Sequence, residues 1–297
     1  MVSTLKILAP AKINLYLKIT GRRADGYHEL NMLMQKLALY DQLELTLVSE
    51  PVIYLSCPGT DLPVNAENIV YRAARLFLDR LGKRDQGIHI VLNKEIPVAA
   101  GLGGGSSDAA AVLLALDKLL VTRCTADTLA AMGLELGADV PFFIFSGAAA
   151  WATGIGEKLE PAVSLSGYRV LLVNPGISVS TKWAYETFAL TSGGNIFNLN
   201  SSQKEQSLDR LGDNFWQRPF HPDTLINDLE TVTAEKFSLI KRIEQDLRAF
   251  GAVGSMMSGS GPTVFGLFSS DVDQQAEQCF REFKKEYDQV YLVDPLA

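Results

Sequence analysis

The segment best suited to chemistry is a glycine-rich stretch at residues 97–107, which reads PVAAGLGGGSS and runs into an Ala/Leu-rich stretch. Glycine has no Cβ, so the backbone can adopt unusual dihedral angles and approach a ligand closely. Successive N–H groups can then point at one anion, and the start of the following helix adds unpaired N–H groups and the positive end of its dipole. Ser106 and Ser107 add hydroxyls for phosphate oxygens or a magnesium shell. These properties predict a phosphate-binding loop; a turn packed tightly against a helix is the alternative.

This glycine-rich stretch matches neither of two common nucleotide-binding motifs. No Gly-Lys-Ser/Thr closes it, so it is not a Walker A loop. Gly101 and Gly103 are followed by Ser106 where a dinucleotide-binding fingerprint has its third glycine. Pro97 also separates these glycines from the strand before them. An oxidoreductase with that fingerprint is therefore disfavoured.

Two polar residues interrupt an apolar segment near the N-terminus. Lys12 and Asn14 fall on one face of a predicted strand, and Ala11, Ile13 and Leu15 fall on the other. A lysine in such a strand needs an anion or a carboxylate if it is buried. The alternative is a solvated face of an edge strand.

Two later segments contain candidate site residues, and for each of them a functional and a structural interpretation stay open. Asp139 lies in the sequence GADVPFF, where it is either a catalytic base or a helix-end or turn group. The sequence SGSGPT at residues 258–263 precedes an apolar strand. Its glycines permit either close approach to a ligand or a simple β-turn.

Composition limits the class of protein. The chain has 297 residues, 47% of them hydrophobic, which favours two globular domains. Its formal net charge of −7 disfavours general binding to nucleic acid or to an anionic membrane. Three scattered cysteines are typical of a reducing compartment, and three scattered histidines form no zinc motif. We expect a cytoplasmic protein without a secretory signal or a transmembrane helix.

Strands and helices are expected in mixed order, which favours an α+β fold over a doubly wound parallel sheet. Gly82 is expected to end the first helix and Thr125 to begin the third. Residues 151–156 are expected to be a connector, and the polar residues 191–210 a long loop. We place the domain boundary near residue 160, giving domains at 1–160 and 161–297. The expected strands are 6–20 with an interruption near Pro10, 32–39, 41–49, 88–92, 168–173, 264–268 and 290–293, and the expected helices are 68–81, 106–120, 125–136, 223–250 and 271–287.

Taken together, the motifs resemble the superfamily of galactokinase, homoserine kinase, mevalonate kinase and phosphomevalonate kinase (the GHMP kinases). The resemblance rests on PAKINL at 10–15, DGYHEL at 25–30, the glycine-rich stretch, GADVP at 137–141 and SGSGP at 258–262. The first two motifs are similar to the branch that phosphorylates a cytidyl sugar alcohol in the non-mevalonate isoprenoid route. The resemblance follows nearly the whole chain and is weak over residues 186–222.

The resemblance implies an N-terminal domain like ribosomal protein S5 domain 2 and a ferredoxin-like C-terminal domain. It also implies ATP as phosphoryl donor, with Mg²⁺ arriving as the ATP complex and no dedicated protein ligand for the metal. Asp108 departs from the expected family pattern, because the resemblance implies Asn or Ala at this position in many relatives. The ATP-binding residues that it implies are Pro97, Val98, Ala99, Ala100, Gly101, Leu102, Gly103, Gly104, Gly105, Ser106, Ser107, Asn68, Lys94, Gly259 and Gly261.

At the acceptor end, the resemblance implies that Asp139 is the general base and that Lys12 orients the hydroxyl and offsets developing charge. Asn14 is similar to a substrate-contacting residue. Tyr27 and His28 match positions that bind the cytosine, and Tyr185 is similar to the second aromatic residue that stacks on it. These implied roles suit phosphoryl transfer, in which positioning and electrostatics carry most of the catalysis.

The expected partners are the cytidyl substrate and ATP, without nucleic acid or membrane, in a monomer or weak homodimer. Three other hypotheses are weighed: a homoserine, mevalonate or shikimate-type kinase, a nucleotide-binding protein without catalysis, and the oxidoreductase considered above. Lys12, Tyr27 and His28 argue against the first. A protein without catalysis would be expected to lack Lys12 or Asp139, and the chain has both.

Overall fold

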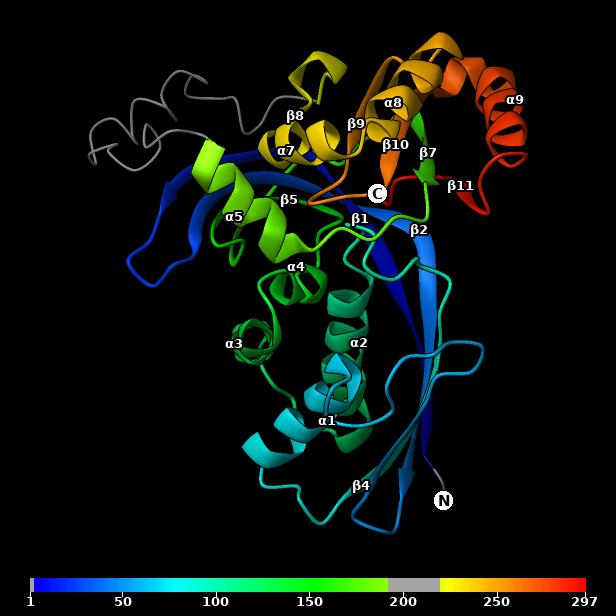
Figure 1. Cartoon of the computed structure of the whole chain (residues 1–297). Coiled ribbons are helices and arrows are strands. Elements are labelled where there is room, and N and C mark those ends of the chain that lie inside the picture. Colours follow the sequence, from blue (N-terminus) through cyan, green and yellow to red (C-terminus); the bar gives the residue numbers. More distant parts are fainter. Residues whose placement is uncertain (1–2, 192–219) are drawn as a thin grey trace. The chain divides into compact units, whose positions relative to one another are not determined.

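The computed structural model describes residues 3–191 and 220–297, and the chain forms two compact units (Figure 1). The first unit comprises Met1–Ala11, Leu39–Val98 and Gly103–Ser146, and the second comprises Lys12–Ala38, Ala99–Leu102 and Gly147–Ala297. The chain thus passes repeatedly from one unit to the other. The boundary expected at residue 160 is a division along the sequence and stays a prediction.

The first unit is a layer of helices on strands. It holds parts of β1 (Thr4–Arg22) and β2 (His28–Val48), with β3 (Ile53–Ser56) and β4 (Gly87–Asn93). Strand β4 pairs antiparallel with β2 over Leu43↔Leu92 and parallel with β3. Figure 1 shows the four helices of this unit on one side of β2 and β4. These helices are α1 (Ile69–Arg80), α2 (Gly104–Leu120), α3 (Ala126–Leu136) and α4 (Val140–Ile144).

Helix α2 is the central helix of this unit, because α1, α3 and α4 all pack against it. Its sequence, GGSSDAAAVLLALDKLL, is apolar on nearly every side after the first turn, as expected for a buried helix. The expected helix signals are confirmed: the Thr125 side chain caps α3 by accepting from the Thr128 N–H, and Gly82 follows the end of α1 with φ +62°.

The second unit contains a four-stranded antiparallel sheet in the order β11-β7-β10-β9. Along the chain these elements run β7-α8-β9-β10-α9-β11, the β-α-β-β-α-β arrangement of a ferredoxin-like fold. The apolar faces of α8 and α9 cover a core that includes Leu171, Ile243 and Phe268. The bounds are β7 Tyr168–Asn174, α8 Leu239–Ala249, β9 Gly254–Met257, β10 Val264–Ser269, α9 Asp273–Phe283 and β11 Gln289–Val293.

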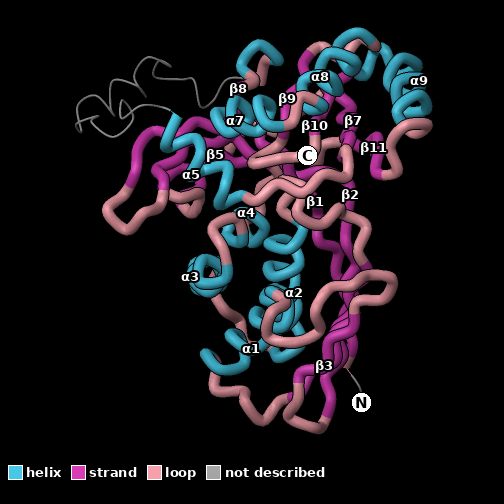
Figure 2. Tube along the Cα trace, viewed as in Figure 1, coloured by secondary structure: helices cyan, strands magenta, loops and turns pink. Residues whose placement is uncertain are grey.

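The remaining elements of the second unit extend the strands that it shares with the first. Within the second unit, β2 pairs with β5 over Met32↔Ala152, and β1 pairs with β8 over Leu17↔Asn227. Helix α5 packs against α7. These elements are β5 Ala149–Gly154, β6 Lys158–Pro161, α5 Thr181–Thr191, β8 Ile226–Asn227 and α7 Asp228–Lys236, with short 3-10 turns at Pro222–Thr224 and Ser270–Val272. The mixed helix and strand content, visible in Figure 2, confirms the α+β class.

Several sequence predictions need correction. Strand β1 continues through Pro10 without a break, and the two strands expected at 32–39 and 41–49 are the single long β2. The expected connector at 151–156 is mostly strand β5, whose apolar residues are buried against β2. Beyond its first residue, the loop expected at 191–210 lies outside the described residues. No helix in the described part of the chain is long and apolar enough to cross a membrane.

Candidate active site

The glycine-rich segment joins β4 to α2 and bends sharply before the helix. Ala99, Gly101 and Gly103 have φ values of +53°, +77° and +72°, a region that L side chains rarely adopt. The first i→i−4 bond of α2 runs from the Ser107 N–H to the Gly103 carbonyl at 2.9 Å. The amides of residues 104–106 therefore precede the helical ladder, as an anion-binding helix start requires.

The first half of this segment is held by the second glycine segment, which joins β9 to β10. The Ser258 hydroxyl donates to the Gly101 carbonyl at 3.0 Å and accepts from the Asn14 N–H at 3.3 Å. The Thr263 N–H donates to the Ala100 carbonyl at 3.3 Å. A Cβ on Gly101 would overlap the Ser258 carbonyl oxygen, so the two backbones meet only because Gly101 is glycine. The structure thus brings together two segments that are about 150 residues apart in sequence.

Lys12 and Asn14 lie at the same place on β1. Their side chains are 4% and 1% exposed, so the solvated-face alternative is wrong. The Lys12 ammonium donates to Asn14 Oδ1 at 2.6 Å. A Cβ on Gly259 would lie 3.6 Å from Lys12 Nζ and 3.4 Å from Asn14 Oδ1. A buried cation beside two glycine turns is a suitable environment for an anionic group.

Asp139 belongs to the first unit and stands at the N-cap of the short helix α4. Its side chain makes no capping hydrogen bond to α4 and is partly exposed. The loop before it lies close to the glycine-rich segment, because a Cβ on Gly137 would be 3.8 Å from Ser106 Oγ. The geometry therefore does not support helix capping as the role of Asp139.

Lys94, at the end of β4, lies in a buried group of charges in the first unit. Its ammonium is paired with Asp41 and, at 2.8 Å, with Asp108 in the first turn of α2. The other Asp41 oxygen accepts from the backbone N–H groups of Glu95 and Ile96 at 2.7 and 2.9 Å. The three charged side chains are 7% exposed or less. They join the chain just before the glycine-rich segment to the helix just after it.

Asn68 is the N-cap of α1. Its Oδ1 accepts from the Val70 N–H at 2.9 Å, and its Nδ2 donates to the Pro63 carbonyl at 2.8 Å. The residue is 7% exposed. These bonds assign Asn68 a structural part, and its implied contact with ATP stays a prediction.

The three aromatic candidates lie in the second unit. The rings of His28 and Tyr185 are stacked, with centroids 5.3 Å apart and planes at 22°. His28 Nε2 is buried without a hydrogen-bond partner among the described residues. Burial, and then the nearby Arg22 guanidinium, lower the pKa of His28, so the imidazole is neutral near pH 7. Tyr27, in the turn before β2, is 58% exposed.

Sequence comparison assigns the family. The model of the GHMP kinases N terminal domain matches residues 68–147, and that of the GHMP kinases C terminal matches residues 206–289. A 4-diphosphocytidyl-2-C-methyl-D-erythritol kinase of Syntrophotalea carbinolica is 49% identical over 88% of this chain and 89% of its own. The chain belongs to the 4-diphosphocytidyl-2-C-methyl-D-erythritol kinase family of GHMP kinases.

Two further comparisons agree with this family. The kinase of the same description from Geobacter sp. strain M21 is 46% identical, with 90% of each chain covered. A crystal structure of a 4-(cytidine 5'-diphospho)-2C-methyl-D-erythritol kinase superposes with a TM-score of 0.77 and is 34% identical, covering 99% of this chain and 100% of that one. The two-domain GHMP kinase fold expected from the motifs is confirmed.

Some residues around the glycine segments of this kinase escaped the sequence reasoning. Asp41 is fully buried, and Ser258 joins the two glycine segments, yet neither was among the predicted site residues. The signal for Asp41 was a lone carboxylate between two apolar stretches of the predicted sheet. Ser258 carried no signal of its own, because its partner Gly101 is distant in sequence.

Asp108, in the first turn of α2, should make the stability of the protein depend on pH. Burial, outweighing the effect of Lys94, raises the pKa of Asp108 to about 7. Between about pH 4 and pH 7 the folded state then binds more protons than the unfolded state, so this group lowers stability as the pH rises. We expect Asp108→Asn to remove this pH-dependent loss of stability. The free energy of unfolding, measured by urea titration, should then vary less between pH 4 and pH 8 than in wild type.

Asp117, on the same helix, offers a control of opposite sign. Burial alone would raise the pKa of Asp117, but hydrogen bonds from Thr122 and Cys124 lower it overall. Asp117 therefore contributes to the free energy of unfolding above the ordinary carboxyl pKa, and this contribution is lost as the pH falls. In Asp117→Asn the free energy of unfolding should fall less steeply at acid pH. If both variants shift the profile in the same direction, the charge assignment for Asp108 is wrong.

Proposed function

We propose that this kinase transfers the γ-phosphoryl group of ATP to the 2-hydroxyl of 4-diphosphocytidyl-2-C-methyl-D-erythritol in the non-mevalonate isoprenoid route. The hydroxyl oxygen forms a bond to the γ-phosphorus, and the bond from that phosphorus to the β,γ-bridging oxygen breaks. The hydroxyl proton passes to a carboxylate of the protein. The products are the 2-phosphate and ADP.

At the phosphate end, the amides at the start of α2 and the positive-φ turns before it would hold the ATP phosphates. The family resemblance assigns the general base to Asp139, the orientation of the hydroxyl to Lys12 and substrate contact to Asn14. Lys12 is a buried cation next to Gly259, where it can offset charge that develops on the transferring group. Phosphoryl transfer needs little covalent participation by the protein, so the rate should depend mainly on how these side chains position the reactants and stabilise charge.

The observation that supports the cytidyl substrate most strongly is the pair of stacked rings, His28 and Tyr185. Nε2 of His28 is buried and has no partner among the described residues, so it has lost its hydrogen bond to water. A ligand that forms a hydrogen bond with this nitrogen recovers that free energy on binding. The edge of cytosine carries both donors and acceptors, so a neutral imidazole can bond to it. Tyr27 and Tyr185 supply aromatic faces for stacking on the base.

Magnesium is proposed to enter as part of the ATP complex, where it neutralises phosphate charge. The Ser107 hydroxyl is buried without a hydrogen-bond partner among the described residues, and Ser106 and Ser107 are the groups we propose for the metal shell. No cluster of three or more His, Cys, Asp or Glu residues in the described chain could hold a metal by itself. A cytoplasmic location and a monomeric or weakly dimeric state are also proposals.

The proposed function is tested by a coupled assay of ADP release with Mg-ATP. The acceptors are 4-diphosphocytidyl-2-C-methyl-D-erythritol, mevalonate and homoserine. Turnover with the cytidyl acceptor alone supports the proposal. Turnover only with mevalonate or homoserine would overturn the roles proposed for Tyr27, His28 and Tyr185 and would leave the phosphate loop in place.

His28→Ala should raise the Michaelis constant for the cytidyl acceptor by about tenfold or more, because each tenfold loss corresponds to roughly 1.4 kcal/mol of lost binding. The Michaelis constant for ATP should change by less than about twofold, because the imidazole is proposed to meet only the base. Steady-state kinetics with each substrate varied in turn give both values.

His89 provides a matched control for His28. It also contacts a tyrosine, with its ring edge-on to that of Tyr54 at 6.4 Å, and it is exposed on β4. His89→Ala should leave both Michaelis constants unchanged. Equal increases for the acceptor and for ATP in His28→Ala would mean that His28 has only a structural role.

A further inference from the structure

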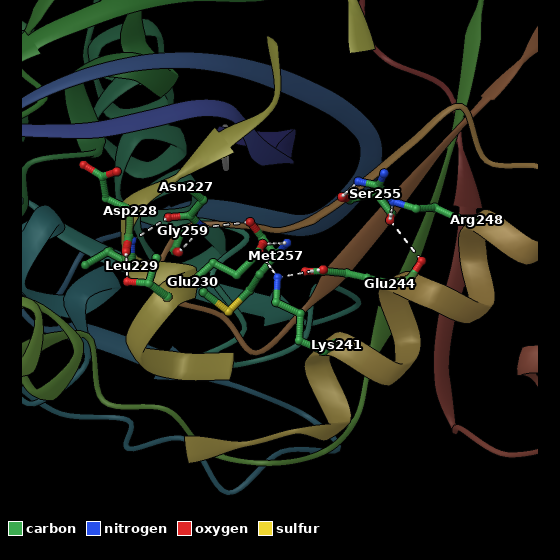
Figure 3. A network of polar contacts seen from close by, with 11 residues as sticks. Asn227, Asp228, Leu229, Glu230, Lys241, Glu244, Arg248, Ser255, Met257 and Gly259 are labelled. Atoms are coloured by element: carbon green, nitrogen blue, oxygen red, sulfur yellow. Dashed lines mark hydrogen bonds and ion pairs between the residues drawn. The ribbon is translucent and has the colours of Figure 1, made fainter. Parts of the chain in front are cut away.

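Helix α7 contacts the second glycine segment through its N-cap residue. Asn227 is 7% exposed, and its Nδ2 donates to the carbonyls of Met257 and Gly259, both at 2.8 Å (Figure 3). Its Oδ1 accepts from the Leu229 N–H at 3.0 Å and so caps the helix. One buried amide thus uses its donors on the last residue of β9 and on the glycine segment, and its acceptor on α7.

A second residue of the same helix turn fixes the other side of the Met257 backbone. Glu230 Oε2 accepts from the Met257 N–H at 2.9 Å. Lys241 of α8 pairs with Glu230 and, at 3.0 Å, with Glu244, which orients the Glu230 carboxylate (Figure 3). The first turn of α7 therefore holds both the N–H and the carbonyl of Met257, immediately before the glycine segment.

The opposite side of this segment faces the residues proposed to handle phosphate. The Ser258 hydroxyl reaches the Gly101 carbonyl, and Gly259 lies against Lys12 and Asn14. A displacement of the Gly259 backbone would change the space around Lys12 and the path of the first glycine segment at Gly101. Asn227 bonds directly to Gly259, but none of its own bonds reaches Lys12 or the first glycine segment.

We propose that Asn227 is a positioning residue for phosphoryl transfer: its amide holds Gly259 at the distance from Lys12 and Gly101 that the ATP phosphates require. The proposal rests on the proposed function, because it assigns Asn227 to the phosphate end of that site. It predicts an effect on ATP and not on the cytidyl acceptor. A residue that only capped α7 would have no such selective effect.

Two substitutions separate positioning from helix capping. Asn227→Asp keeps a capping oxygen and the side-chain shape, but it replaces the donor with an oxygen that faces two carbonyl oxygens. Asn227→Ser also caps a helix well, and its short side chain cannot reach both carbonyls. Both should lower kcat/KM for ATP, Asn227→Asp by about a hundredfold, as for a misplacement of about 1 Å near the chemistry. The Michaelis constant for the cytidyl acceptor should stay within about twofold of wild type.

Thr233 supplies the control for a loosened α7. It is fully buried on this helix, and its hydroxyl has no hydrogen-bond partner in the described structure. Thr233→Gly leaves a cavity and a flexible residue in α7, so it should lower the melting temperature without changing kcat/KM for ATP. Normal ATP kinetics in both Asn227 variants would overturn the proposal, as would an equal kinetic loss in Thr233→Gly.

Hydrogen exchange gives a readout that does not depend on activity. The Ser258 amide donates to the Thr263 carbonyl, and the Gly261 amide donates to the Ser258 carbonyl, both at 2.9 Å. Both amides should exchange faster in Asn227→Asp, while those of β10 keep their protection. Unchanged exchange would overturn the proposal. Failure of wild-type protein to bind Mg-ATP in calorimetry would instead overturn the proposed function, and the exchange result would still decide whether Asn227 holds the segment.

Discussion

Asp139→Asn should lower kcat by about 10²- to 10⁴-fold, the usual contribution of a positioned general base. Asparagine has nearly the same shape but cannot accept the proton of the attacking hydroxyl. The change removes no helix cap, because the Asp139 side chain makes no capping bond to α4. Single-turnover kinetics would measure the chemical step, and calorimetry should give a dissociation constant for Mg-ATP close to that of wild type.

Glu135 is a suitable control for this substitution because it is also a carboxylate of the same segment. It pairs with Arg80 on the surface at 2.7 Å, an interaction that contributes little to stability. Glu135→Gln should therefore keep the wild-type rate. A near-wild-type rate in Asp139→Asn would show that another group accepts the proton, and the base would have to be sought elsewhere.

Local signals predicted those parts of the fold whose structure depends on nearby residues. Thr125 as an N-cap and Gly82 at a helix end need only their own helix for their effect, so both were predicted correctly. The glycine-rich segment was predicted to turn into a helix because its glycines and the following Ala/Leu run are contiguous. The residue types alone also indicated phosphate chemistry there.

Other features depend on contacts that sequence reasoning does not reveal. Strand β5 was expected to be a connector, and it becomes a strand because β2, over a hundred residues earlier, supplies its hydrogen bonds. Asp41 looks like a solvated charge until Lys94 and two backbone amides meet it in the buried interior. Asn227 falls inside the helix expected at 223–250, but in the structure it is the N-cap of α7. Its bonds to Met257 and Gly259 follow only from the tertiary fold.

Gly101→Ala should damage both the fold and the use of ATP. An alanine at φ +77° costs about 1–2 kcal/mol in backbone strain. Its Cβ would also overlap the Ser258 carbonyl oxygen, and a backbone atom cannot rotate away as a flexible side chain can. The two glycine segments must separate, so we expect kcat/KM for ATP to fall by about a hundredfold or more. Urea unfolding and steady-state kinetics would measure the two effects.

A substitution at Gly82 separates the effect of backbone strain from that of the steric overlap. Its φ is +62°, but a Cβ there would have no atom within 4 Å, so Gly82→Ala carries the dihedral cost without a clash. It should lose about 1 kcal/mol of stability and retain wild-type kinetics with ATP. If Gly101→Ala loses no more than Gly82→Ala in both measurements, close contact of the two glycine segments is not needed for catalysis. A large additional loss confined to ATP would instead show that the rate depends on how closely the Ser258 backbone approaches Gly101.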